Sequence, residues 1–177
     1  GDSQTQSFPN ARHQRLNQKG ASHIHTYALE FCETQGHFCW RPHLRDHMFT
    51  IKVRSHQREE LVEFTDEVAA KLKESGAESG IVVLYVQHTT AGLTVNENAD
   101  PDVPRDMLHA LRTLIPQHGM GFRHGEENSD AHIKASLTGP SVTIPFADGK
   151  LLLGRWQGIF LCEFDGARER KVIMMIR

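Results

Sequence analysis

The last third of the chain contains two Asp-Gly pairs, each flanked by short apolar runs. Asp148-Gly149 lies between S-V-T-I-P-F and L-L-L-G-R-W, and Asp165-Gly166 lies between G-I-F-L-C-E-F and R-K-V-I-M-M-I-R. Asp-Gly between such runs favours a tight β-hairpin turn, because both residues tolerate the left-handed backbone that the turn requires. The sequence therefore predicts two hairpins, whose four strands form an antiparallel sheet.

Three further strands are predicted upstream. In residues 48–53, M-F-T-I-K-V, every second residue from Phe49 is apolar, as in a half-buried strand. Residues 81–86, I-V-V-L-Y-V, form a continuous apolar run typical of a central strand covered on both faces. A short strand is expected over residues 92–95.

Helical periodicity appears twice. The first stripe ends near Gly76 and consists of Leu61, Phe64, Val68 and Leu72. The second helix is expected to begin at Asp100-Pro101, with Asp100 as N-cap and Pro101 at the first helical position, and to end before Pro116. Its buried stripe would be Val103, Met107, Leu111 and Leu114.

These elements predict a compact α+β domain, mostly antiparallel, with two sheets packed face to face in a sandwich-like arrangement and two to three helices. With 177 residues, 38% of them hydrophobic and 24% charged, one globular domain is the simplest expectation. Residues 1–47 lack a sustained period. We expect them to be a disordered or non-native leader, and residues 48–177 to be the domain.

The net charge and the hydropathy of the chain limit the kinds of partner that the protein is expected to bind. A formal charge of −2 gives no basic footprint for nucleic acid or an anionic membrane, and no apolar run approaches the roughly 20 residues of a membrane span. The three cysteines are odd in number, and Cys162 lies in an apolar run where a free thiol fills space. We expect a cytoplasmic protein.

Histidines and carboxylates gather between residues 88 and 132. His88 follows the buried strand, and His124 and His132 flank a polar, glycine-rich segment that can fold both imidazoles together. Such a set suits proton transfer or a metal, zinc or another transition ion at the imidazoles or magnesium at carboxylates. The alternative for His88 is a histidine hydrogen-bonded at a strand end.

Three other polar residues each have two possible roles. Asp100 is either a helix cap or a ligand contact beside Glu97, and Asp130 either caps a helix near His132 or orients an imidazole. Lys134 could bind a phosphate or lie on the solvated surface. No phosphate-binding loop, dinucleotide-binding glycine motif, zinc-protease motif or serine-hydrolase elbow is present.

Three long motifs carry a family resemblance. H-T-T-A-G-L-T-V-N-E-N-A-D-P-D-V at 88–103, R-H-G-E-E-N-S-D-A-H-I-K-A-S-L-T-G at 123–139 and L-G-R-W-Q-G-I-F-L-C-E-F-D-G at 153–166 closely resemble the YjbQ family. The resemblance covers residues 48–177. It implies a compact α+β domain that forms a homotrimer, with the pocket near the subunit contact and a divalent metal at His88, His124 and His132.

The residue patterns and the resemblance together give the candidate site roles. Catalytic candidates are His88, Glu97, Asp100, His124, Asp130 and His132, and substrate-binding candidates are Thr89, Thr90, Asn96, Asn128, Ser129, Lys134, Gln157 and Glu163. The implied activity is that of a secondary thiamine-phosphate synthase, a transferase that joins a pyrimidine methyl diphosphate to a thiazole phosphate and releases pyrophosphate. Two alternatives stay open: a metal-dependent hydrolase of a small phosphorylated or carbonyl metabolite, and a non-catalytic anion-binding trimer.

Overall fold

The computed structural model describes residues 27–32, 37–42 and 47–177. The chain divides into two units, residues 1–43 and 44–177. In the first unit, β1 (Tyr27–Cys32) and β2 (His37–Pro42) form an antiparallel hairpin. The rest of the expected leader lies outside the described residues, and its disorder stays a prediction.

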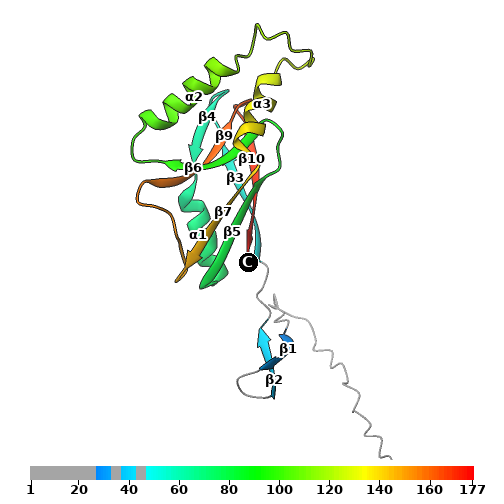
Figure 1. The fold of residues 1–177 in the computed structure, drawn as a ribbon, viewed down its shortest axis with the longest axis vertical. Coiled ribbons are helices and arrows are strands. Elements are labelled where there is room, and N and C mark those ends of the chain that lie inside the picture. Colours follow the sequence, from blue (N-terminus) through cyan, green and yellow to red (C-terminus); the bar gives the residue numbers. More distant parts are fainter. Residues whose placement is uncertain (1–26, 33–36, 43–46) are drawn as a thin grey trace, which may run out of the picture. The chain divides into compact units, whose positions relative to one another are not determined.

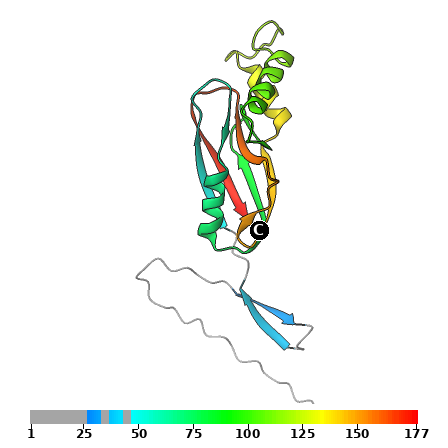
Figure 2. The same cartoon turned by 90° about the vertical axis from the view of Figure 1, so that its left-hand side faces the viewer.

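The second unit contains two antiparallel sheets and three helices, which confirms the α+β class (Figures 1 and 2). The five-stranded sheet has the order β3 (His47–Arg54), β10 (Glu169–Ile176), β5 (Ser79–Val86), β7 (Ser141–Ala147) and β8 (Lys150–Leu151). The three-stranded sheet has the order β4 (Glu60–Glu63), β9 (Gln157–Glu163) and β6 (Ala91–Glu97). The helices are α1 (Thr65–Ser75), α2 (Asp102–Leu114) and α3 (Ser129–Thr138).

One apolar core joins the two sheets and α1. It includes Ile51 and Val172 from the larger sheet, Leu161 from the smaller sheet and Val68 from α1, all at most 5% exposed. Helix α1 lies at one end of the domain, and α2 and α3 lie at the other (Figure 1). The apolar core therefore fixes the positions of the two sheets and of α1. The loops at the α2–α3 end are not part of this core and can carry the residues of a site.

Strand β5 differs from its prediction. Its buried residues alternate with exposed ones, so that Val82 and Leu84 face the core whereas Ile81 and Tyr85 are 40% and 46% exposed. The expectation of a strand covered on both faces was wrong, because the residues on the outer face of β5 are exposed or only partly buried within the described chain. An apolar run in a sequence does not reveal which face remains uncovered.

The first predicted hairpin is confirmed and the second is wrong. Strands β7 and β8 pair around Asp148 and Gly149, which both have left-handed backbones, although β8 extends over only two residues. Strand β9 pairs with β4 and β6, whereas β10 pairs with β3 and β5. The segment around Asp165-Gly166 therefore carries the chain from one sheet to the other.

The helices also depart from their patterns. Gly76 ends α1 in the left-handed conformation as expected, but Leu61 lies in β4 and not on the helix. Asp100 Oδ1 accepts the backbone N–H of Asp102 at 2.9 Å, but α2 starts at Asp102 with Pro101 at the N-cap position, one residue later than predicted. The stripe of α2 is at most half-buried, and Leu114 is 71% exposed. Among the described helices, none combines the length and apolar composition needed to cross a membrane.

Candidate functional site

All three predicted histidines line one pocket of about 380 Å³ that adjoins the amino end of α3. We call it the histidine pocket. Its lining residues come from the segment after β5, the segment before α3, α3 itself, the β9–β10 connection and the start of β10: Gln87, His88, Thr89, Thr90, His124, Glu126, Asn128, His132, Asp165, Arg168 and Arg170. The tertiary structure thus gathers residues from three separate stretches of sequence, within 87–90, 124–132 and 165–170.

His88 is held in a defined state. Gln87 N–H donates to Lys171 O at 3.2 Å, and the N–H of the same Lys171 donates to His88 Nε2 at 3.0 Å. A backbone N–H can only donate, so Nε2 carries a lone pair and the neutral ring has its proton on Nδ1. Burial, and next the positive charge of Arg170, hold the pKa of His88 below its usual range. His88 is therefore a neutral imidazole with a fixed tautomer.

His124 and His132 lie edge to face, with ring centroids 5.4 Å apart and planes at 76°. His124 belongs to the segment before α3 and is about half exposed, and its Nε2 lies 4.0 Å from Glu126 Oε2. His132 is fixed on the first turns of α3. The pair consequently combines one imidazole on a helix with one on a more exposed segment.

A buried ion pair supports the pocket from below. Arg170 donates to both carboxylate oxygens of Glu163, with Nε to Oε2 at 2.7 Å, and to Thr90 Oγ1 at 2.9 Å. Ser55 Oγ donates to Glu163 Oε2 at 3.0 Å. Burial alone would raise the pKa of Glu163, but hydrogen bonds from Arg170 and the Asp165 backbone outweigh it and keep the pKa low. Glu163 therefore lies under the pocket as a structural ion-pair partner.

A second polar group orders the rim. Asp165 Oδ2 accepts from Arg168 at 3.0 Å and from Asn128 Nδ2 at 3.1 Å, and Asn128 Nδ2 also lies 3.3 Å from Glu126 Oε2. Asn128 is the N-cap residue of α3, so the amino end of this helix adjoins the pocket. The guanidinium of Arg168 is half exposed and remains accessible to a ligand.

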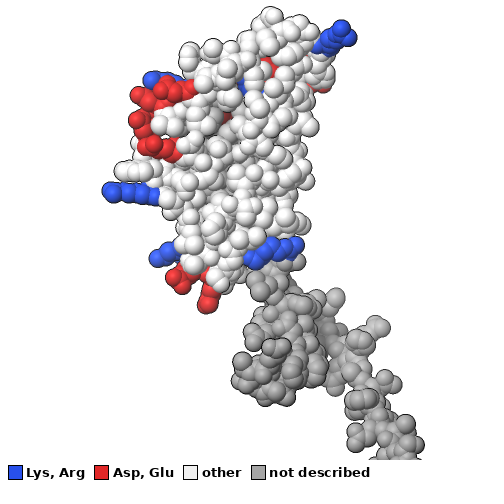
Figure 3. Space-filling view, in the orientation of Figure 1, with Lys and Arg blue, Asp and Glu red and all other residues white. Residues whose placement is uncertain are grey.

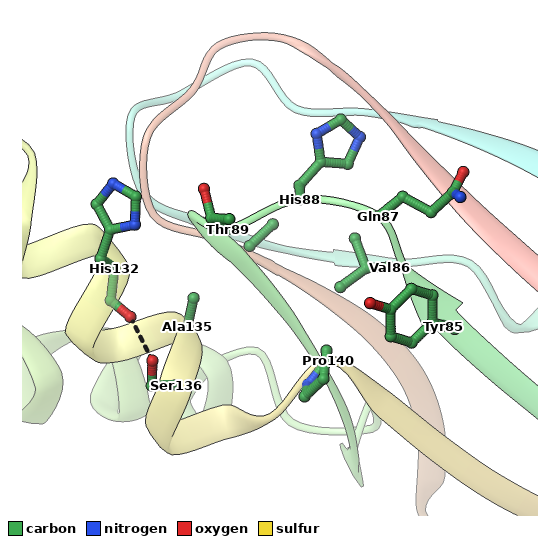
Figure 4. A pocket seen from close by; sticks show the side chains of 10 residues that line it. Tyr85, Val86, Gln87, His88, Thr89, His132, Ala135, Ser136 and Pro140 are labelled. Carbon is green, nitrogen blue, oxygen red and sulfur yellow. Dashed lines mark hydrogen bonds between the residues drawn. The ribbon is translucent and has the colours of Figure 1, made fainter.

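A larger cavity of about 560 Å³ adjoins the histidine pocket (Figure 4). The two share Gln87, His88, Thr89 and His132. On its other side it is bordered by Tyr85, Ala135, Ser136 and Pro140, and Ser136 Oγ donates to the carbonyl oxygen of His132 at 2.8 Å. His88 and His132 thus separate a polar pocket from a more apolar one.

Four predicted site residues lie at the opposite end of β6. Asn96 contacts Met107, Glu97 is in register with Gln157, and the Gln157 side chain accepts from Gly154 N–H. With a rise of about 3.3 Å per residue, the Ala91–Glu97 strand places Glu97 about 20 Å from the Thr90 end. Asn96, Glu97, Asp100 and Gln157 therefore do not join the histidines within this chain.

Asp130 and Lys134 also face away from the histidine pocket, although they lie on α3. They are 0% and 1% exposed and bind each other at 2.9 Å, with Arg58 and Glu59 as further partners. Burial alone would raise the pKa of Asp130, but hydrogen bonds from Arg58 and Lys134 hold it below its usual range. Ser129, the first residue of α3, is half-buried and does not line the pocket.

The metal expected at the histidines is not supported by the geometry. Within the part of the chain that the structure describes, no group of three His, Cys, Asp or Glu side chains could hold a metal ion. The edge-to-face pair of His124 and His132 has no third ligand placed with it.

Sequence reasoning missed Arg168, Arg170 and Asp165. One signal was present for Arg170, because it occupies an inward position in the alternation that continues with Val172 and Met174. A charged residue at an inward strand position indicates a buried partner, and Glu163 within an apolar run is the matching signal. Asp165 and Arg168 gave no signal, because they were assigned to a hairpin turn.

Comparison with known proteins identifies relatives over the second unit. Residues 49–177 match the family model described as UPF0047 protein YjbQ-like. A UPF0047 protein of Methanocaldococcus jannaschii is 51% identical over 129 residues, which cover 73% of this chain and 93% of that protein. The UPF0047 protein YugU of Bacillus subtilis is 46% identical over 121 residues, which cover 68% and 92%.

Solved structures agree. A YjbQ/UPF0047 family protein from Clostridium acetobutylicum superposes with a TM-score of 0.70 at 46% identity, covering 72% of this chain and 99% of that one. A YbjQ-like protein of unknown function from Sulfolobus solfataricus gives 0.71 at 32% identity, covering 75% and 96%. The expectation of a thiamine-phosphate synthase transferase was wrong: the M. jannaschii and B. subtilis relatives are described only as UPF0047 proteins, and the S. solfataricus protein as one of unknown function.

Proposed function

Since this chain belongs to the UPF0047 YjbQ-like family, whose reaction has to be inferred from the site, we propose that it is an enzyme that transfers protons on a small anionic metabolite. The observation that carries the proposal is the His124–His132 pair in one pocket with His88. Imidazole is the side chain whose ordinary pKa best suits it to donate and accept protons near neutral pH.

The three imidazoles would have different roles. His124 and His132 would act as the proton-transfer pair, with Glu126 close enough to orient His124. His88 would donate a hydrogen bond from Nδ1, because its Nε2 is already used by Lys171. Because His88 is neutral and its tautomer is fixed, its Nδ1–H would polarise a carbonyl group or bind a hydroxyl group of the substrate. It would not take up the proton that His124 and His132 transfer.

Two arginines and a helix end would hold an anionic ligand in the pocket, although Arg168 also pairs with Asp165 and Arg170 with Glu163. Arg168 presents a half-exposed guanidinium at the rim, and the amino end of α3 adds partial positive charge through its free N–H groups. Arg170 adds positive charge at the pocket wall, although its hydrogen bonds already go to Glu163 and Thr90. A phosphate or carboxylate group of a small metabolite would satisfy this arrangement.

The test is turnover of a defined library of phosphorylated and carboxylated metabolites, followed by NMR in D2O to detect both products and deuterium incorporation. The wild-type protein should act on at least one compound. His132→Gln should lower that rate by about 100-fold or more, the usual contribution of a general acid or base. His109→Gln, an exposed histidine on α2, is the matched control and should leave the rate unchanged.

Two results would contradict the proposal. Binding of anionic metabolites without turnover or exchange would make the pocket a receptor site and not an active site. Turnover that survives both His132→Gln and His124→Gln would place the chemistry elsewhere. Elemental analysis of the same protein samples checks the expected divalent metal, which stays a prediction.

We also propose that the chain forms a homotrimer through the outer face of β5. This face exposes Ile81 and Tyr85 beside the 560 Å³ cavity, and the centre of the surface seen in Figure 3 is almost free of charged side chains. Light scattering should give three times the chain mass for the wild type. Tyr85→Glu should reduce it, whereas Leu114→Glu, on the exposed side of α2, should not.

A further inference from the structure

A second charged cleft of about 370 Å³ lies between α2, α3 and the segment before β4. We call it the arginine cleft; its lining residues are Gln57, Arg58, Glu59, Arg112, Gln117 and Lys134. It shares no lining residue with the histidine pocket. The proposed function makes no use of it.

Its ionic groups are tightly connected. The ammonium group of the buried Lys134 bridges Glu59 and Asp130, with Asp130 Oδ2 at 2.9 Å. Arg58 binds Asp130 with both terminal nitrogens, at 3.1 and 2.9 Å. Arg112 donates from Nε to Glu59 and more weakly from its terminal nitrogen to the Glu59 carbonyl.

The charges in this cluster do not balance. Arg58, Arg112 and Lys134 carry three positive charges, whereas Glu59 and Asp130 carry two negative ones. Asp165, whose charge also reaches Arg58, is paired with Arg168. The cleft therefore keeps a net positive charge beside a lysine that is 1% exposed.

Donors also outnumber acceptors. All four carboxylate oxygens of Glu59 and Asp130 already accept hydrogen bonds from the three cations. An arginine has five N–H donors and a lysine ammonium has three. Arg112 and Lys134 thus retain donors on the cleft wall, and a ligand that only accepts, an oxyanion, is the chemical complement.

Helix α3 separates the two sites. Asn128 and His132, four residues apart, line the histidine pocket, whereas Asp130 and Lys134, offset by two residues, belong to the other cluster. Two residues correspond to about 200° around a helix, so the pairs lie on opposite sides. The same helix thus borders both sites, and a ligand in the cleft would contact the side of α3 opposite His132.

We propose that the arginine cleft is a second binding site, for a small multivalent oxyanion that bears phosphate or carboxylate groups. Arg112 presents guanidinium N–H groups that suit either anion, Arg58 adds positive charge although its terminal nitrogens already bind Asp130, and Lys134 supplies a buried positive charge on the wall. The site is distinct from the proposed active site, so each can fail without the other.

The experiment is calorimetric titration of the full chain with sodium diphosphate and, separately, with citrate, at matched ionic strength. Arg112→Gln should weaken one binding event by roughly tenfold or more, which is the scale of a lost charge-assisted hydrogen bond. Arg105→Gln, an exposed arginine on the same helix, is the matched control and should bind like the wild type. A His124→Ala/His132→Ala variant should retain this event, which separates the cleft from the histidine pocket.

The two titrants distinguish the sources of the anion: tighter binding of diphosphate identifies a phosphorylated ligand, and tighter binding of citrate a polycarboxylate. Wild-type affinity for both anions in Arg112→Gln, or the absence of any event that survives in the histidine variant, would overturn the proposal. If Arg112→Gln does not fold, the wild-type protein provides the test through the Nε–Hε NMR signals of Arg58 and Arg112. Diphosphate or citrate bound in the cleft must change the chemical shifts of these signals, and sodium chloride at the same ionic strength must not.

Discussion

The backbone N–H of Lys171 donates a hydrogen bond to Nε2 of His88 at 3.0 Å. Gln87 lies opposite Lys171 and donates its N–H to the Lys171 carbonyl oxygen, so the imidazole takes the place that the Gln87 carbonyl oxygen would have as acceptor in the ladder between β5 and β10. A strand end thus fixes the tautomer of a pocket histidine.

The first prediction concerns the charge of His88. Because its pKa is lowered, the unfolded chain binds a proton as pH falls below about 6.5 while the folded protein does not yet do so. Folding should therefore lose stability below that pH, with no effect of this group above it. NMR titration should show that His88 becomes protonated at a lower pH than a free imidazole. The His88→Gln variant should show a smaller loss of unfolding free energy as the pH falls below that value. An ordinary His88 titration would contradict the assignment.

The second prediction concerns the buried Glu163–Arg170 pair. Glu163→Ala leaves Arg170 buried without its partner, so the free energy of unfolding should fall by about 3–5 kcal/mol. Urea denaturation measures the change. Glu169→Gln breaks an exposed pair with Lys52 and should denature almost like the wild type. Equal effects of the two variants would show that burial does not decide the outcome.

The third prediction concerns the contact of α3 with β6. A Cβ atom on Gly92 would lie 1.9 Å from Thr138 Oγ1 and 2.9 Å from the carbonyl oxygen of Gly139. Gly92→Ala must displace the end of α3 and should cost about 1–3 kcal/mol of stability. Gly125→Ala is the matched control, because a Cβ there meets no atom within 4 Å. Thermal unfolding of both variants tests the difference.

The fourth prediction concerns Cys162. Burial raises the pKa of this thiol to about 12, and the side chain is 1% exposed. Iodoacetamide at pH 8 should leave Cys162 unmodified in the folded protein and should modify it in concentrated urea, as peptide mass spectrometry can show. Rapid modification without denaturant would mean that β9 opens locally.

The strength of the local patterns explains which elements were predictable from the sequence. The Asp148-Gly149 hairpin, the end of α1 at Gly76 and the strand that delivers His88 each depend on neighbouring residues, so the sequence indicated them. The three histidines were expected to lie together, and they line one pocket. The long family motifs indicated the same fold class.

Pairings between distant residues were decided by the tertiary structure. The run before Asp165-Gly166 and the run after it look like a hairpin, yet β9 and β10 bury their apolar faces in different sheets. Lys134 meets Glu59 across 75 positions of sequence, and this contact removes it from the histidine pocket. Sequence periodicity predicts that a residue is buried. Which residue forms an ion pair with a buried charge depends on which helices and strands the core brings together.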